Sequence, residues 1–351
     1  MQSHDAVIIG AGIIGVSLAL ELQKRGLRVL VLEQGMPGRA ATFAGAGMLA
    51  AQEVDSPLAL RELALASARL YPGFVKELEC HSGLSIDFRR DGTICFLDRD
   101  DPTARPRGRT LSPDELRALE PAVFPSSNAY FLEEDSVDPR SLFPALLHSA
   151  VSAGVEIKSR TKVLELVVSS GVVSGVRTTL GPFSSAIVVN CAGAWAAQIS
   201  GADIPALPVK GHMFSVKPSS PGWLRHVVRS KDVYLVPRSD GRCLIGSTVE
   251  RVGFDQNVDS GVIQTLHALA AALVPSVAPL PVTEAWTGLR PGSPDDLPII
   301  GETGIKNYFA ATGHYRNGIL LAPVTAKVMA DLVLGNDPKF DISRFSPARF
   351  R

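Results

Sequence analysis

Three glycines near the N-terminus have the spacing of a phosphate-binding turn. Residues 10–15 read GAGIIG, after a buried strand expected at 6–9 and before a helix expected at 16–25. In such a turn Gly10 permits the sharp bend, Gly12 lets the backbone approach a pyrophosphate, and Gly15 lets the helix pack closely on the strand. The motif predicts a dinucleotide site; the alternative is a glycine-rich turn in an ordinary α/β fold.

An acidic residue follows at the position where such a unit binds ribose. A second strand expected at 27–32 ends on Glu33, eighteen residues after Gly15. A carboxylate there accepts hydrogen bonds from ribose hydroxyls and disfavours a 2′-phosphate. The segment therefore predicts a βαβ unit for a dinucleotide other than NADP. The small residues of 41–50 let the backbone approach a flat ring system, although a flexible loop explains them equally well.

Two arginines lie in glycine-rich turns next to apolar runs. Arg290 stands in GLRPG at 288–292, and Arg316 in GHYRNG at 313–318. An arginine fork holds a carboxylate through two parallel hydrogen bonds, which fixes its orientation as well as its charge. We therefore expect both side chains to bind substrate, with a structural ion pair as the alternative, above all for Arg316.

The elements expected around these residues form two interleaved domains. Helices are expected at 57–78, 138–153, 264–274 and 318–334, a hairpin at 163–178, and sheet-like alternation from 209 to 249. The predicted fold class is an α/β composite: a Rossmann-type domain interleaved with a mainly antiparallel β-sheet substrate domain. The predicted ranges are 1–80, 140–205 and 290–351 for the first domain, and 81–139 and 206–289 for the second.

Composition excludes several classes of function. The 35 basic and 35 acidic side chains cancel among 351 residues, which argues against nucleic acid or an anionic membrane as partner. The apolar N-terminal run follows an acidic residue and contains regular glycines, so it is no signal peptide. No apolar stretch has the length of a membrane span. We expect a soluble, cytoplasmic protein.

The cysteines and histidines predict no metal site. Cys80, Cys95, Cys191 and Cys243 show no CxxC spacing and are expected to be reduced thiols. Six of the seven histidines have no ligand spacing, and the seventh, His314, stands in GHYRNG at 313–318.

The motifs together resemble the D-amino-acid-oxidase superfamily of flavoproteins and, within it, the glycine oxidases linked to thiamine biosynthesis. The resemblance spans nearly the whole chain. Its residues are GAGIIG at 10–15, AGAGMLAA at 44–51, VNCAGAW at 189–195, PVKG at 208–211, GLRPG at 288–292 and GHYRNGILLAP at 313–323, of which the last two are the most specific.

The resemblance implies FAD as cofactor and assigns residues to it. These are Gly10, Gly12, Ile13, Ile14, Gly15, Glu33, Gln34, Ala41, Thr42, Ala46, Gly47, Met48 and Val163, and in the C-terminal motif Gly313, His314, Tyr315, Arg316, Asn317, Gly318, Ile319 and Leu320. The turn from 314 to 320 would cover the isoalloxazine end, where amides at a helix start stabilise negative charge. Some relatives attach flavin to a cysteine in the C-terminal third, but none follows Cys243, so we expect non-covalent FAD.

The same resemblance assigns the substrate site. Arg290, Arg316 and Tyr234 would contact the substrate, with Met48, Ala50 and Val249 in the pocket wall, although core packing explains these last three almost as well. The implied reaction is oxidation of glycine, sarcosine or D-alanine to an imine, hydrolysed to oxo acid and ammonia, with oxygen reduced to hydrogen peroxide.

Two other functions remain open. One is a dehydrogenase of small amino acids with another electron acceptor, of the hydrogen cyanide synthase or D-amino-acid or proline dehydrogenase type. The other is a flavin-binding protein without turnover. The family expectation for assembly is a homotetramer.

Overall fold

The N-terminal βαβ unit forms as the sequence predicts. In the computed structural model, which describes residues 4–52, 57–97, 108–124, 128–220 and 222–351, strand β1 (Ala6–Ile9) leads through the glycine turn into helix α1 (Ile13–Lys24) and strand β2 (Val29–Leu32). Every residue of both strands is buried, as expected for strands covered on both faces. Helix α1 begins three residues earlier than expected, directly after Gly12 and within the GAGIIG motif.

A six-stranded sheet surrounds this unit. Its spatial order is β19 (Ile299–Glu302), β20 (Tyr308–Thr312), β13 (Ile187–Asn190), β1, β2 and β9 (Glu156–Lys158). All neighbouring pairs are parallel except β19 with β20. Parallel neighbours place the carboxyl ends of β1, β2, β13 and β20 at one edge, which is where open α/β sheets bind ligands.

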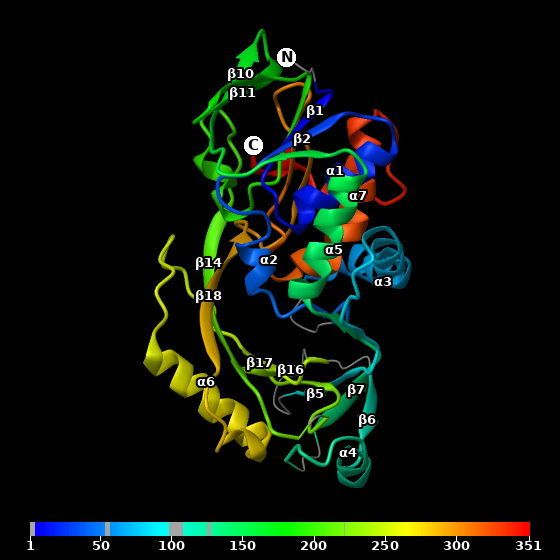
Figure 1. Ribbon diagram of the computed structural model, residues 1–351, viewed down its shortest axis with the longest axis vertical. Helices are drawn as coiled ribbons and strands as arrows, with labels where there is room; N and C mark the ends of the chain where they lie inside the picture. Colours follow the sequence, from blue (N-terminus) through cyan, green and yellow to red (C-terminus); the bar gives the residue numbers. More distant parts are fainter. Residues whose placement is uncertain (1–3, 53–56, 98–107, 125–127, 221) are drawn as a thin grey trace.

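Alternate residues of β1 face two different layers. Ala6 and Ile8 pack in a hydrophobic cluster with α1, α3 (Arg61–Ser82), α5 (Pro139–Ser152) and α7 (Gly318–Val333). Val7 and Ile9 pack on the other side, in a cluster that includes a three-stranded sheet of β10 (Val163–Ser169), β11 (Val172–Thr178) and β12 (Gly181–Ser184). The central sheet is therefore sandwiched between helices and a small sheet (Figure 1).

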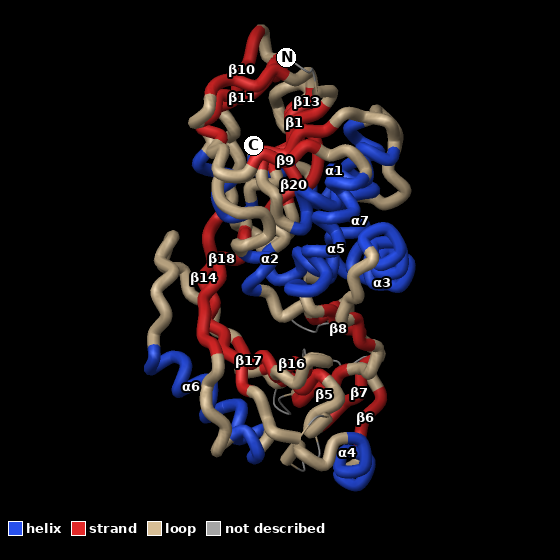
Figure 2. The backbone as a smooth tube through the Cα atoms, in the orientation of Figure 1, coloured by secondary structure: helices blue, strands red, loops and turns tan. Residues whose placement is uncertain are grey.

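An eight-stranded sheet forms the other half of the molecule (Figure 2). Its order is β18 (Glu284–Gly292), β14 (Leu207–Val216), β17 (Cys243–Gly246), β16 (Tyr234–Pro237), β15 (Val227–Arg229), β5 (Thr93–Phe96), β7 (Ala129–Leu132) and β6 (Arg109–Leu111). Only β15 with β5 is parallel among these pairs, so the expectation of a mainly antiparallel second sheet is confirmed. Helix α6 (Ser260–Leu273) packs on β14 and β17.

Strands β14 and β18 connect the two halves. Nine residue pairs join them, from Leu207 with Gly292 to Ser215 with Glu284. In Figure 1 the pair runs along one side of the molecule from the six-stranded sheet towards the lower half. The end of β18 thereby carries Arg290 towards the carboxyl edge of the first sheet.

The remaining elements are short or lie at the junction. They are α2 (Ala41–Ala44), α4 (Pro113–Leu119), β3 (Met48–Leu49), β4 (Phe88–Arg89) and β8 (Asp135–Val137), and the 3₁₀ segments η1 (Leu58–Leu60), η2 (Gly193–Gln198), η3 (Pro275–Val277), η4 (Tyr315–Asn317), η5 (Ser343–Phe345) and η6 (Pro347–Phe350). Strands β3, β8 and β4 form a further small sheet.

Helix α3 differs from its expected bounds of 57–78. A 3₁₀ turn precedes it, and the helix runs to Ser82, past the predicted domain boundary at 80. Gly83 then adopts a left-handed conformation with φ of 70°, which ends the helix. The exact domain boundaries remain a prediction.

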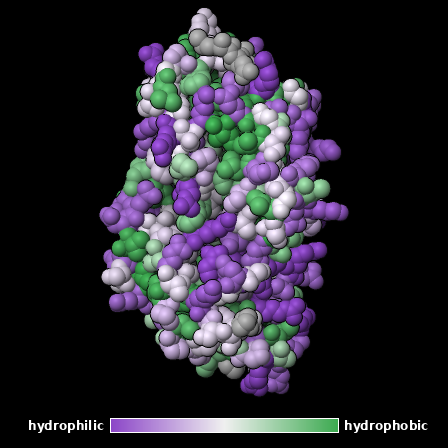
Figure 3. All heavy atoms as spheres, viewed as in Figure 1, coloured by the Kyte–Doolittle hydropathy of each residue, from purple (hydrophilic) through white to green (hydrophobic). Residues whose placement is uncertain are grey.

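The surface in Figure 3 mixes hydrophilic residues with separate hydrophobic patches. Within the described residues, no helix combines the length and the apolar character needed to cross a bilayer.

Candidate functional site

A long pocket lies where the carboxyl edge of the six-stranded sheet meets β14 and β18. It is lined from the glycine turn, the segment before and within α2, the segment after β13, and the turn before α7. The predicted site residues that line it are Gly10, Gly12, Ile13, Ile14, Glu33, Gln34, Ala41, Thr42, Ala46, Gly47, Met48, Ala50, Val163, Tyr234, Arg290, His314, Tyr315, Arg316, Asn317, Gly318 and Ile319. Residues that are far apart in the sequence thus meet in one space.

The three glycines of the turn each meet a different spatial demand. Gly10 has φ of 102°, and a Cβ atom there would lie 2.5 Å from the carbonyl oxygen of Cys191. A Cβ atom at Gly15 would lie 2.0 Å from the carbonyl oxygen of Gly10, so helix and strand require a glycine there. At Gly12 the nearest atom would be Thr42 Oγ1 at 3.5 Å, and a side chain would fill the pocket. These contacts match the roles expected from the motif.

Glu33 is fixed at the end of β2 by backbone donors. Its carboxylate oxygens accept from Ala11 N and from Gly35 N, each at 2.8 Å. The side chain lines the pocket beside the glycine turn. A carboxylate oxygen can accept more than one hydrogen bond, so Glu33 can also accept from the hydroxyls of a ribose.

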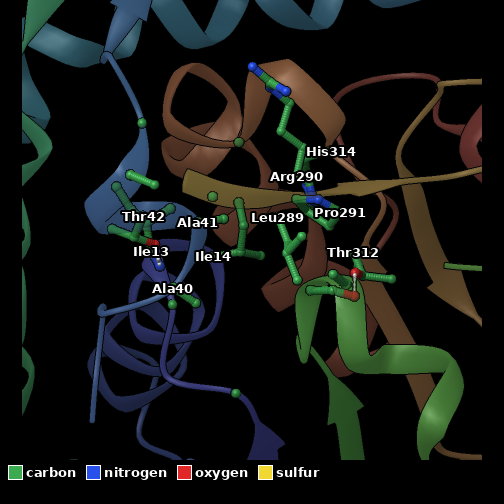
Figure 4. Close-up of a pocket in the computed structure, with 18 of the residues that line it drawn as sticks. Ile13, Ile14, Ala40, Ala41, Thr42, Leu289, Arg290, Pro291, Thr312 and His314 are labelled. Atoms are coloured by element: carbon green, nitrogen blue, oxygen red, sulfur yellow. Dashed lines mark hydrogen bonds between the residues drawn. The ribbon is translucent and has the colours of Figure 1, made fainter. Parts of the chain in front are cut away.

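The segment from the end of α2 to β3 is held by donors from the second half of the molecule and from β8. Trp286 Nε1 donates to Ala44 O at 3.2 Å, Arg238 Nη2 donates to Ala46 O, and Val137 N donates to Gly47 O at 2.9 Å. On the other side of the segment, Thr42 Oγ1 accepts from Ile13 N at 3.0 Å, at the start of α1. The carbonyl oxygens of Ala44, Ala46 and Gly47 are thereby bonded within the protein, and the small residues of this segment line the pocket; Figure 4 shows Ala41 and Thr42 on this side.

His314 carries a buried nitrogen that has no hydrogen-bond partner among the described residues. Its side chain is 1% exposed, and Nε2 lies 3.1 Å from Thr325 Oγ1. Among the described residues, Nδ1 has no hydrogen-bond partner. Burial lowers the pKa of this imidazole to about 3, so His314 is neutral at physiological pH and can bind a ligand through Nδ1.

Arg290 lines the opposite wall from the glycine turn. In Figure 4, Ile13 and Thr42 lie on one side of the pocket, and Leu289, Arg290 and Pro291 on the other. Nη1 of Arg290 donates to Lys210 O at 3.2 Å and Thr248 O at 3.0 Å, and Nη2 donates to Ser247 Oγ at 2.6 Å. The guanidinium has no carboxylate partner among these groups, so its charge can pair with an anionic ligand.

Tyr234 and Arg316 line the same pocket. The Tyr234 hydroxyl lies 3.6 Å from Met213 Sδ, which is a weak acceptor, so the hydroxyl can donate to a stronger one. Arg316 lies in η4 with an exposed side chain at the pocket rim. Two cations and a phenol therefore meet in one pocket.

The structure places four predicted residues outside the pocket lining. Gly15, Gly313 and Leu320 support it from behind. Val249, expected in the wall, has 54% of its surface exposed and does not line the pocket. The chain leaves the pocket after Ser247, because Glu250 pairs through its backbone with Lys210.

Several lining residues were not predicted from the sequence. Segment 191–195 supplies one wall, where Thr312 Oγ1 donates to Gly193 O at 3.0 Å. Gly211 and Ser247 lie beside Arg290. Gly211 is the glycine of the PVKG motif, so the sequence contained a signal for it, whereas Ser247 stands in no motif. Among described residues, no cluster of three or more His, Cys, Asp or Glu could hold a metal ion.

Comparison with known proteins assigns this architecture. The family model described as "DAO: FAD dependent oxidoreductase" matches residues 5–332. Glycine oxidase of Pseudomonas aeruginosa is 34% identical over 99% of this chain and 99% of its own length. Hydrogen cyanide synthase subunit HcnC of the same organism is 33% identical over 100% of this chain and 97% of its own length.

A longer relative and a solved structure agree with this. The bifunctional protein ThiO/ThiG of Trichormus variabilis is 35% identical over 100% of this chain, which spans 56% of that protein. The crystal structure of glycine oxidase from Geobacillus kaustophilus superimposes with a TM-score of 0.92 at 34% identity, covering 99% of each chain. The chain belongs to the DAO family of FAD-dependent oxidoreductases, and it is an FAD-dependent oxidoreductase of amines or amino acids.

Proposed function

We propose that this enzyme oxidises glycine and small relatives such as sarcosine and D-alanine. The observation that carries the proposal is the guanidinium of Arg290, which lies in the pocket opposite the glycine turn and has no carboxylate partner among the residues that the structure describes. A free carboxylate distinguishes an amino acid from a simple amine. Arg290 would bind it as a fork, which fixes the α-carbon as well as the charge.

The residues that would hold FAD fit the group. Gly12 leaves space for a pyrophosphate, Glu33 offers a carboxylate to a ribose, and His314, whose Nδ1 has no hydrogen-bond partner among the described residues, also lines the pocket. Cys191 lines the pocket but is buried, and burial raises the pKa of its thiol, so it is a poor nucleophile for attachment. These observations support non-covalent FAD.

A bound FAD would supply the acceptor for a hydride from the α-carbon; water would hydrolyse the resulting imine to an oxo acid and ammonia, and oxygen would take the two electrons to give hydrogen peroxide. The protein's own contribution is orientation and exclusion of water. Arg290 would bind the carboxylate, the Tyr234 hydroxyl would donate to it, and Arg316 would cover it from the rim. Met48 and Ala50 would limit the size of the side chain on the α-carbon.

A second function is favoured by one relative. HcnC, a hydrogen cyanide synthase subunit, matches the whole chain at 33% identity. The second candidate function is a dehydrogenase that oxidises a small amino acid in the same pocket and passes the electrons to an acceptor other than oxygen. Hydrogen peroxide measured per glycine consumed, with oxygen as the only acceptor, separates the two: a ratio of about one supports the oxidase, and slow turnover that an artificial acceptor accelerates supports the dehydrogenase.

The experiment that tests the substrate is anaerobic. Purified holoenzyme is mixed with glycine, sarcosine, D-alanine or D-proline, and the loss of flavin absorbance is followed. We expect the small amino acids to bleach the flavin. If none does, the protein binds flavin without turnover of this class.

The place of the reaction in the cell is also a proposal. Similarity to ThiO/ThiG supports a role in supplying the glycine-derived imine or oxo acid for thiamine thiazole synthesis. A homotetrameric assembly, a cytoplasmic location and the two-domain division at 1–80, 140–205 and 290–351 against 81–139 and 206–289 belong to the same proposal.

A further inference from the structure

Arg290 is oriented by three acceptors from two neighbouring segments. Two of them are backbone oxygens, of Lys210 in β14 and of Thr248 after β17. The third is the hydroxyl oxygen of Ser247, at 2.6 Å from Nη2. Ser247 therefore supplies the side-chain acceptor of this set, and it also lines the pocket.

These bonds decide which edge of the guanidinium a carboxylate can use. A guanidinium carries five N–H donors. Within the described part of the chain, both N–H groups of Nη1 and one of Nη2 bond to the protein. None of these bonds uses Nε, so Nε and Nη2, which share one edge of the guanidinium, keep donors for a carboxylate.

The position of the guanidinium also depends on a missing side chain. A Cβ atom at Gly211 would lie 2.3 Å from Nη1, 2.4 Å from Nη2 and 2.6 Å from Cζ of Arg290. Gly211 pairs with Gly288 across β14 and β18, so the surface under the guanidinium carries no side chain. The guanidinium of Arg290 lies flat on this surface, and the hydrogen bond to Ser247 limits its rotation within the plane.

We propose that Ser247 is a positioning residue for substrate binding: its hydroxyl fixes the Arg290 guanidinium so that the Nε and Nη2 edge faces the substrate carboxylate. This rests on the proposed function, since it requires a carboxylate bound by Arg290. Without the hydroxyl, the Nη2 group turns between several orientations, and the fork is no longer preformed before the substrate arrives.

The test uses S247A, S247T and a matched serine in the same sheet. Ser215 in β14 bonds through its hydroxyl to Thr283 Oγ1 at 2.8 Å and does not line the pocket, so S215A removes a comparable buried hydrogen bond elsewhere.

We expect S247A to raise KM for glycine about tenfold, with kcat changed by less than about twofold, because a hydrogen bond to a charged group is lost. The Kd of the inhibitor glycolate, titrated by its effect on the flavin spectrum, should rise by the same factor. S247T, which keeps a hydroxyl, should restore both values, and S215A should leave both unchanged.

A double variant separates positioning from general damage. In the R290A background, S247A should have no further effect on the glycolate Kd, because Ser247 acts through Arg290. If S247A is not obtained folded, S247C takes its place, because a thiol sulfur is only a weak acceptor for the guanidinium: KM should rise and kcat should hold. The proposal is overturned if S247A or S247C leaves KM and the glycolate Kd at wild-type values, or if S247A weakens binding equally with and without Arg290. If R290A itself binds glycolate as wild type does, the proposed function is wrong about Arg290, whatever Ser247 does.

Discussion

Gly288 of β18 lies directly against Ala44 of α2: a Cβ atom at position 288 would be 2.5 Å from the Cβ atom of Ala44. Two residues earlier, Trp286 Nε1 donates to Ala44 O at 3.2 Å. Arg140 from α5 stacks on both rings of this junction, with Cζ 3.9 Å from the Phe43 centroid and 4.5 Å from that of Trp286. The strand that carries Arg290 is thereby fixed to the segment that would hold FAD.

The first prediction follows from this close packing. Gly288→Ala should push α2 away from β18, cost about 1–3 kcal/mol of stability, and weaken FAD retention. The measurements are Tm and the flavin-to-protein absorbance ratio after desalting. Gly73→Ala is the control, since nothing lies within 4 Å of a Cβ atom at this position in α3, and its Tm should stay equal or rise. Equal flavin content in G288A and wild type would contradict the prediction.

The second prediction concerns Glu33. Glu33→Ala should weaken FAD binding for two reasons: the ribose hydroxyls lose an acceptor, and Ala11 N and Gly35 N lose theirs. Glu33→Gln keeps one acceptor oxygen but presents an amide to one of these donors, so its affinity should lie between the two. Titration of apoprotein with FAD, followed by fluorescence, gives the three Kd values. An unchanged Kd in E33A would mean that Glu33 is not the ribose ligand.

The third prediction concerns Arg290. Losing a hydrogen-bonded partner of a buried charge costs roughly 2–5 kcal/mol, so Arg290→Ala should lower kcat/KM for glycine by about 30-fold to several thousand-fold. Arg290→Lys should recover only part of this, because an ammonium is a point charge without a planar fork. The flavin spectrum should stay near wild type. Near-normal kcat/KM in R290A would leave Arg316 and Tyr234 to hold the carboxylate.

The fourth prediction concerns pH. The pKa of His314 is lowered by burial to about 3, against an ordinary value of 6.5. Above about pH 6.5 the imidazole is neutral in both the folded and the unfolded protein, so it does not lower the free energy of unfolding. As the pH falls towards 3, the unfolded chain binds a proton that the folded protein does not bind. The free energy of unfolding should therefore fall by about 1.4 kcal/mol per pH unit in this window from this one group.

His314→Gln removes this titrating group, so H314Q is the reference for the pH dependence of the wild-type protein. The difference in Tm between wild type and H314Q should be largest at pH 7 and shrink steadily between pH 6.5 and 4.5. A difference that stays constant with pH would show that His314 does not titrate in this way.

Local sequence signals were enough to predict the first half of the site. The glycine turn, the strands around it and Glu33 lie within thirty residues. The spacing of the three glycines is enough to predict why each position excludes a side chain. The resemblance extended this to Arg290, Tyr234 and the turn before α7, all of which the structure brings into one pocket.

The rest depends on register and could not be predicted. Whether Ser247 or Val249 faces the pocket depends on where β17 ends and on the backbone pairing of Glu250 with Lys210. The contact of Gly211 with Arg290 depends on the pairing of β14 with β18, strands more than sixty residues apart. The stacking of Arg140 depends on three elements that meet only in the folded chain.

The most direct test of the account is anaerobic reduction of the bound flavin by glycine, compared with methylamine, which lacks a carboxylate. The account predicts that glycine bleaches the flavin of the wild-type enzyme in a saturable reaction, and that methylamine at the same concentration reduces it slowly or not at all. It also predicts that R290A abolishes most of this preference. Equal reduction by both amines, or none by glycine, sarcosine or D-alanine, would contradict the claim that this pocket binds small amino acids through a carboxylate at Arg290.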